Sequence, residues 1–109
     1  MSLPEMPPLD LNPQDWAIVR DILAAHVPQF EVWAFGSRVK WTAKEYSDLD
    51  LALVTDKPLD WSVSTALAEA FDESDIPIKV DLVDWASTSA AFRQIIEKDK
   101  VVVQSKHKV

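Results

Sequence analysis

The stretch AFGSRVKWTAKEYSDLDLAL, residues 34–53, contains the two most unusual features of this chain. It holds the chain's single glycine, Gly36, directly before Ser37, although average usage of about 7% would give roughly eight glycines in a chain of this length. It ends in an apolar segment that carries two aspartates, Asp48 and Asp50, two positions apart. The fold and the chemistry of the chain have to account for these residues.

Both ends of this stretch have the composition of buried β-strands. FEVWAFG, residues 30–36, is rich in β-branched and aromatic residues, which predicts a strand that ends at the glycine. DLDLALV, residues 48–54, alternates in polarity with a period of two, as a half-buried strand does. The alternation places two sets of side chains on opposite faces: Leu49, Leu51 and Leu53 on one, and Asp48, Asp50 and Ala52 on the other.

Helix and strand signals alternate along the rest of the chain. Asn12 and Pro13 predict a helix start, with the helix running to about His26, and further helices are expected over residues 60–72 and 87–98. IKVDLVD, residues 78–84, reads as a third strand and residues 101–103 as an edge strand. In the last helix we expect three apolar residues to face inward: Phe92, Ile95 and Ile96. These elements predict an α/β (α+β) domain with a small mixed β-sheet flanked by helices.

Length and composition limit the organisation of the chain. Its 109 residues suit one domain, which we place at residues 12–104. Residues 1–11, with three prolines, are expected to form a flexible N-terminal arm, and residues 105–109 a polar C-terminal tail.

The overall charge and the missing residue types exclude several classes of function. A net charge of −7 opposes direct nucleic-acid binding, which needs clustered Lys and Arg, and suits a basic partner protein. Without cysteine, a metal would have oxygen or imidazole ligands. No apolar run is long enough to span a membrane and no export signal begins the chain, which predicts a cytoplasmic protein without membrane contact.

Three aspartates are candidate metal ligands. Asp48 and Asp50 share one strand face, and Asp81 stands in the centre of the 78–84 segment. Unit charges about 4 Å apart repel by roughly 4 kcal/mol at an effective dielectric near 20, so converging carboxylates favour a proton or a divalent cation such as Mg²⁺ or Mn²⁺. The alternative is that Asp48 caps a turn while Asp50 and Asp81 face solvent with nothing bound.

Gly36 and Ser37 are candidate phosphate ligands. A glycine between a strand and a helix lets the backbone approach a ligand closely, and the helix N-terminus and serine hydroxyl can hold a phosphate. Arg38 and Lys40 would add positive charge beside it. A glycine that serves only a tight turn remains the alternative. An anion holder beside a cation site would suit a metal–triphosphate.

Taken together, these residues resemble the DNA polymerase β-type nucleotidyltransferase superfamily. The shared pattern is Gly36-Ser37, ten intervening residues, Asp48-Leu49-Asp50 and an aspartate, Asp81, on a later strand. Within that superfamily the short chain looks most like the minimal nucleotidyltransferases that act as antitoxins beside an all-helical HEPN-domain toxin. The resemblance covers residues 15–104 and implies the polymerase β-like nucleotidyltransferase fold.

The resemblance also implies a reaction and its residues. It implies transfer of a nucleoside monophosphate, AMP from ATP, by two Mg²⁺ ions, to a tyrosine hydroxyl of the HEPN-type toxin, with which the chain would form a hetero-oligomer. Asp48, Asp50 and Asp81 would be the catalytic metal ligands, with Asp81 also helping to activate the acceptor hydroxyl. Gly36 and Ser37 would bind the triphosphate.

One position departs from the family pattern. The usual motif reads G-S-R-x-x-G, and here its second glycine is replaced by Trp41, which predicts a bulkier loop. The alternative function is therefore a catalytically silent antitoxin that keeps the fold and neutralises its partner by binding alone.

Overall fold

Four strands form one mixed sheet in the computed structural model, which describes residues 6–106. The strands are β1 (Glu31–Phe35), β2 (Leu49–Val54), β3 (Val80–Asp84) and β4 (Val101–Gln104). Their order across the sheet is β3-β2-β1-β4, with β1 antiparallel to both β2 and β4, and β2 parallel to β3. The prediction of a small mixed sheet with a C-terminal edge strand is confirmed.

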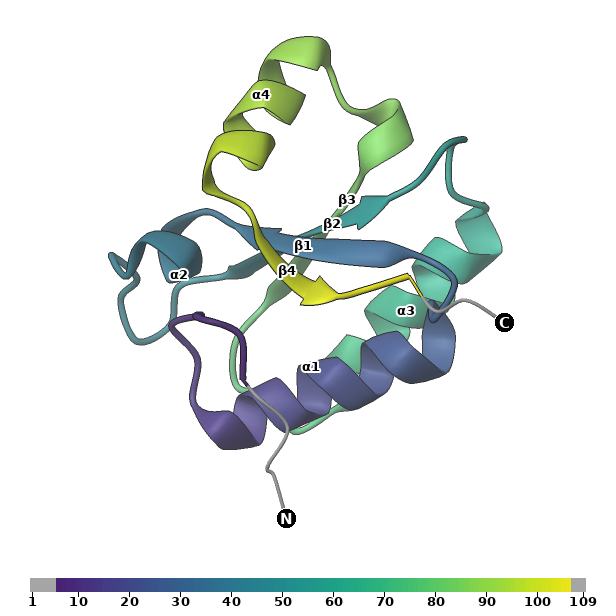
Figure 1. Cartoon of the computed structure of the whole chain (residues 1–109). Helices are drawn as coiled ribbons and strands as arrows, with labels where there is room; N and C mark the ends of the chain where they lie inside the picture. Colours follow the sequence, from purple (N-terminus) through teal and green to yellow (C-terminus); the bar gives the residue numbers. More distant parts are fainter. Residues whose placement is uncertain (1–5, 107–109) are drawn as a thin grey trace.

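Helices cover the two faces of the sheet unequally. The helices α1 (Pro13–His26) and α3 (Trp61–Glu73) lie together against one face, and α4 (Ala90–Asp99) stands on the other (Figure 1). A single turn of helix, α2 (Ser37–Lys40), follows β1, and the 3₁₀ turn η1 (Trp85–Ser87) follows β3. The face that carries α4 is therefore only partly covered.

Local sequence signals explain where the helices begin. The Asn12 side chain accepts a hydrogen bond from the Asp15 N–H at 2.8 Å, and Pro13 occupies the first helical position of α1. The Ser89 hydroxyl accepts from the Phe92 N–H at the start of α4. These caps satisfy backbone donors that have no partner within the helix.

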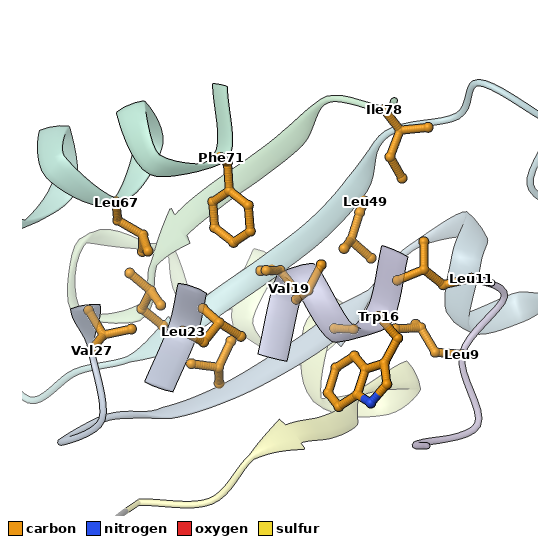
Figure 2. Close-up of a cluster of buried hydrophobic side chains, with 14 residues drawn as sticks. Leu9, Leu11, Trp16, Val19, Leu23, Val27, Leu49, Leu67, Phe71 and Ile78 are labelled. Atoms are coloured by element: carbon orange, nitrogen blue, oxygen red, sulfur yellow. The ribbon is translucent and has the colours of Figure 1, made fainter. Parts of the chain in front are cut away.

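The main core lies between the sheet and the pair α1 and α3. Figure 2 shows the side chains of α1 and α3 converging on those of the sheet. The three leucines of β2 all contribute to this cluster, as their alternation predicts. Its members are Leu9, Leu11, Trp16, Val19, Leu23, Val27, Val32, Ala34, Leu49, Leu51, Leu53, Leu67, Phe71 and Ile78.

A smaller core lies under α4, and here one prediction is wrong. Ile96 is fully buried against Trp33 and Phe35, and Phe92, although 37% exposed, packs its ring against Phe35 with 5.7 Å between the ring centroids. Ile95, by contrast, is 57% exposed. The 3₁₀ turn η1 delays the start of α4 to Ala90, and α4 covers only part of this face. Ile95 therefore lies on the flank of the helix and not beneath it.

The first described residues contact the rest of the domain. Leu9 and Leu11 are buried in the main core, and the Asp10 N–H donates to the Arg38 carbonyl at 2.8 Å. Two apolar side chains of residues 6–11 are therefore buried in the domain, and the boundary between arm and domain at residue 12 stays a prediction. Residues 1–5 and 107–109, the rest of the expected arm and most of the expected tail, lie outside the described residues. Within residues 6–106, no helix combines the length and hydrophobicity needed to cross a membrane.

Candidate active site

Asp50 and Asp81 are direct neighbours on adjacent parallel strands. The pairing of β2 with β3 places Asp50 opposite Asp81, and Asp48 comes two residues before Asp50, directly before the start of β2. Ala52 and Val83, the next residues on this side of the two strands, belong to the small core under α4. The carboxylates therefore lie on the less covered face, and the strands that carry Asp50 and Asp81 are neighbours in the sheet.

The neighbouring charges change the protonation of Asp50. Burial, followed by repulsion from Asp81 and Asp48, raises the pKa of the Asp50 carboxyl group. A raised pKa means that the folded site disfavours the charged form of Asp50. A nearby cation would therefore stabilise this arrangement.

Gly36 directly follows β1 and lies beside the same carboxylate. Phe35 pairs with Asp50 across β1 and β2, so the next residue, Gly36, reaches the Asp50 side chain. A Cβ placed on Gly36 would lie 2.5 Å from Asp50 Oδ2. The backbone of Gly36 has φ 84° and ψ −156°, a combination that is essentially restricted to glycine. Two independent constraints, backbone conformation and close approach, thus require glycine here.

The donor set fits a hard divalent cation. Asp48, Asp50 and Asp81 offer carboxylate oxygens, which Mg²⁺ and Mn²⁺ prefer, and both neighbouring carboxylates contribute to the raised pKa of Asp50. Within residues 6–106, no three acidic, histidine or cysteine side chains are already grouped closely enough to hold one ion. A cation would draw the carboxylates together and offset their repulsion.

Lys79 is a site residue that the sequence analysis missed. Its Nζ lies 3.4 Å from Asp81 Oδ1, and both side chains are substantially exposed. Lys79 and Asp81 are two residues apart, so the period of a strand could have placed them on one face. An exposed ion pair of this kind contributes little to stability, so it would be a weak competitor for a cation that binds Asp81.

The two predicted basic ligands have other partners in the structure. Lys40 Nζ lies 3.3 Å from Asp99 Oδ2, an ion pair that links α2 to α4. Arg38 is only 7% exposed, and its guanidinium group donates to backbone carbonyls. Their role in nucleotide binding stays a prediction.

Trp41 occupies a position that favours glycine. It caps the C-terminal end of α2 with φ 58° and ψ 33°, in the left-handed region, and it is 62% exposed. Among the described residues it is the single non-glycine with positive φ. The glycine of the usual motif therefore has a conformational reason, and the tryptophan adopts the same backbone at a cost.

The fold and the site identify the class of the protein. The family described as polymerase beta, nucleotidyltransferase, matches residues 19–108, and the chain belongs to this family. It is thus a nucleotidyltransferase, with a nucleotide as substrate, as the sequence predicted. The chain is 56% identical over 100 residues to a probable protein adenylyltransferase, MntA, of Haemophilus influenzae, covering 92% of this chain and 88% of that protein.

Solved toxin–antitoxin complexes contain similar chains. One, a toxin–antitoxin with AMP-PNP, has a TM-score of 0.63 at 26% identity and covers 83% of this chain and 73% of that one. Another contains a tri-AMPylated HEPN toxin of Shewanella oneidensis with its MNT antitoxin. Its TM-score is 0.56 at 25% identity, with 84% of this chain and 71% of that one covered.

Proposed function

We propose that the chain is a Mg²⁺-dependent protein adenylyltransferase that transfers AMP from ATP to a tyrosine hydroxyl of a HEPN-type toxin and so acts as its antitoxin. The observation that carries this proposal is the register of Asp50 against Asp81 beside Gly36, on a face left partly open by α4. The 56% identity to a probable protein adenylyltransferase supports the same reaction.

The triphosphate would bind at the junction of β1 and α2. Gly36 has no side chain to keep a phosphate from the backbone, and the Ser37 hydroxyl and the N–H groups at the start of α2 can donate to phosphate oxygens. Lys40 on the same turn adds a positive charge once a phosphate competes with Asp99 for it. This junction adjoins Asp50, so the reacting phosphate would lie over the carboxylates.

The carboxylates would organise the transfer itself. Asp48, Asp50 and Asp81 would hold two Mg²⁺ ions, which supply charge stabilisation for the attacking and leaving oxygens of an in-line displacement. Asp81 would accept a hydrogen bond from the tyrosine hydroxyl and favour loss of its proton. The tyrosine oxygen then forms a bond to the α-phosphorus as the bond to pyrophosphate breaks, and the proton leaves the site.

The partner would complete the site. The described chain offers one wall, a sheet face beside α2 and α4 (Figure 1), and correct positioning of two reactants contributes up to roughly 7 to 11 kcal/mol to lowering a barrier. The acidic chain, with a net charge of −7, would attract a basic toxin by electrostatic steering. The acceptor tyrosine would then enter beside Asp81.

A mass measurement tests this function. The chain is incubated with Mg²⁺, ATP and a HEPN-type protein from its own genome, and the intact mass of that protein is followed. We expect additions of whole AMP units, abolished by Asp48→Asn, by Asp50→Asn or by EDTA. Asp84→Asn is the matched control, since it removes a carboxylate from the same strand as Asp81 at a site that serves structure.

The binding-only alternative gives a different result. If the toxin gains no mass and is neutralised equally by the parent and by both aspartate variants, the chain is a silent antitoxin. The backbone cost at Trp41, beside the predicted triphosphate site, is the observation that keeps this alternative open.

A further inference from the structure

Arg38 has an unusual environment for a residue beside a phosphate-binding motif. Its side chain is 7% exposed, and its guanidinium group is surrounded by backbone carbonyls from two distant segments. Nε donates to the Ser47 carbonyl at 3.0 Å, and Nη1 donates to the Asp10 carbonyl at 2.8 Å. Nη2 donates to the carbonyls of Glu45 and Lys44 at 3.1 and 3.4 Å. The guanidinium group is thus occupied within the protein.

These contacts hold the loop that leads to the catalytic aspartates. The segment from Lys44 to Ser47 is a closed turn, in which the Ser47 N–H donates to the Lys44 carbonyl at 3.0 Å and the Lys44 N–H donates to Ser47 Oγ at 2.8 Å. Arg38 binds three carbonyls of this turn. The turn and the start of α2 are therefore held in one arrangement.

The hydrogen bond from Arg38 Nε connects the Gly36-Ser37 motif with the aspartate motif. Arg38 directly follows Ser37, and Ser47 directly precedes Asp48, so a 3.0 Å hydrogen bond connects the neighbours of the predicted phosphate ligand and the predicted metal ligand. The N-terminal segment adds two hydrogen bonds to Arg38. The Asp10 N–H donates to the Arg38 carbonyl, and the Asp10 carbonyl accepts from Arg38 Nη1. Ten residues separate Ser37 from Asp48 along the chain, and those after Lys40 lie outside any helix or strand.

We propose that Arg38 is a positioning residue, which fixes Asp48 relative to Ser37 by binding the carbonyls of the 44–47 turn and does not contact the triphosphate. This inference rests on the proposed function, since it assigns a role within that site. A lysine could not replace Arg38, because a single ammonium group lacks the planar set of donors that reaches four carbonyls in two segments. A phosphate ligand, by contrast, would tolerate lysine as a point charge.

The test compares Arg38→Gln and Arg38→Lys with the parent chain. Leu67→Ala is the control for a general loss of stability, since Leu67 lies in α3 within the main core. Backbone hydrogen exchange of residues 42–48 reports the loop, and Mn²⁺ titration without nucleotide reports the placement of the aspartates. ATP and tripolyphosphate titrations report the phosphate site.

We expect both Arg38 variants to lose protection in the 42–48 loop relative to the sheet, and to bind Mn²⁺ about 10–100-fold more weakly, as substitutions that misplace metal ligands do. Leu67→Ala should lower protection broadly and leave Mn²⁺ affinity unchanged at temperatures where it is folded. Arg38→Lys, the milder change, keeps the test valid if Arg38→Gln does not fold.

Two outcomes would overturn the positioning role. In the first, both variants keep the loop protection and the Mn²⁺ affinity of the parent chain but bind tripolyphosphate more weakly, which would make Arg38 a phosphate ligand. The other is a loosened loop with parental Mn²⁺ affinity, which would make it a loop tether only. Failure of the proposed function looks different, because the parent chain itself would then transfer no AMP to the toxin.

Discussion

Gly36 and the Asp50 carboxylate occupy adjoining space, so that a methyl group on Gly36 would lie 2.5 Å from Asp50 Oδ2. The antiparallel pairing of Phe35 with Asp50 brings the end of β1 to this carboxylate. The glycine therefore serves the placement of Asp50 as well as the turn into α2. The Gly36-Ser37 motif and the aspartate motif are parts of one packed unit.

Gly36→Ala tests this relationship through a double-mutant cycle. Alanine at φ 84° and ψ −156° should cost about 1–3 kcal/mol of unfolding free energy from backbone strain alone, and the contact with Oδ2 should add to that. In an Asp50→Ala background the contact is absent, so the same substitution should cost less. Urea unfolding of the four chains measures the difference, and an equal cost in both backgrounds would show that the carboxylate is not the obstacle.

Asp50→Asn should stabilise the chain at neutral pH when no divalent cation is present. Burial, then Asp81 and Asp48, raise the pKa of Asp50, so the folded state carries an unfavourable charge above that pKa. The amide removes this charge, and the gain should disappear as the pH falls through the raised pKa, where the parent carboxyl becomes protonated. Melting curves from pH 7 downward measure the difference in melting temperature between Asp50→Asn and the parent chain. A difference that grows in acid would contradict a raised pKa of Asp50.

The parent chain and Asp50→Asn should differ in their response to Mg²⁺ with ATP. A ligand that binds only the folded state stabilises it by about 2.7 kcal/mol at a hundred times its dissociation constant. The parent should gain melting temperature, and Asp50→Asn should gain little or nothing. Equal gains would remove Asp50 from the proposed metal ligands.

Asp84→Asn should destabilise the chain without affecting this ligand response. Burial favours the neutral Asp84, but hydrogen bonds from Thr55, Leu59, Ser87 and Ala86 outweigh it and lower the pKa of Asp84. The amide would turn an N–H donor toward the Thr55 hydroxyl or the Leu59 N–H, at a cost of about 1–3 kcal/mol. The cost should be full at neutral pH and shrink as the pH falls through the lowered pKa. A loss of the Mg²⁺ with ATP response in this variant would connect Asp84 to the site.

Patterns with a short period made most of the fold and the carboxylate site predictable from the sequence. The alternation in residues 48–54 assigns Leu49 and Asp50 to opposite faces without knowledge of the rest of the chain. The strand that carries Asp81 had only to lie beside β2 for the carboxylates to meet, and the parallel register places Asp81 opposite Asp50.

Contacts between distant segments were not predictable in the same way. Arg38 carries a charge beside a phosphate motif, so its sequence context favours a ligand role, and only the path of residues 10 and 44–47 shows that carbonyls surround it. The burial of Leu9 depends on the same path. Ile95 was misplaced because helical periodicity does not reveal how much of the sheet α4 covers.

Variants of Trp41 test how much stability the chain loses by having a residue other than glycine at this position of the motif. Its backbone lies in the left-handed region at φ 58°, where a residue with a Cβ pays about 1–2 kcal/mol that glycine does not pay. Glycine loses more backbone entropy on folding than alanine does, and this loss offsets roughly 0.5–1 kcal/mol of the advantage of glycine. Trp41→Gly should therefore be more stable than Trp41→Ala by up to about 1.5 kcal/mol. The alanine variant is the matched control, since both lose the indole ring and differ only at Cβ. Urea unfolding of the two variants measures the difference, and an alanine variant as stable as the glycine variant would mean that the left-handed backbone at residue 41 carries no cost.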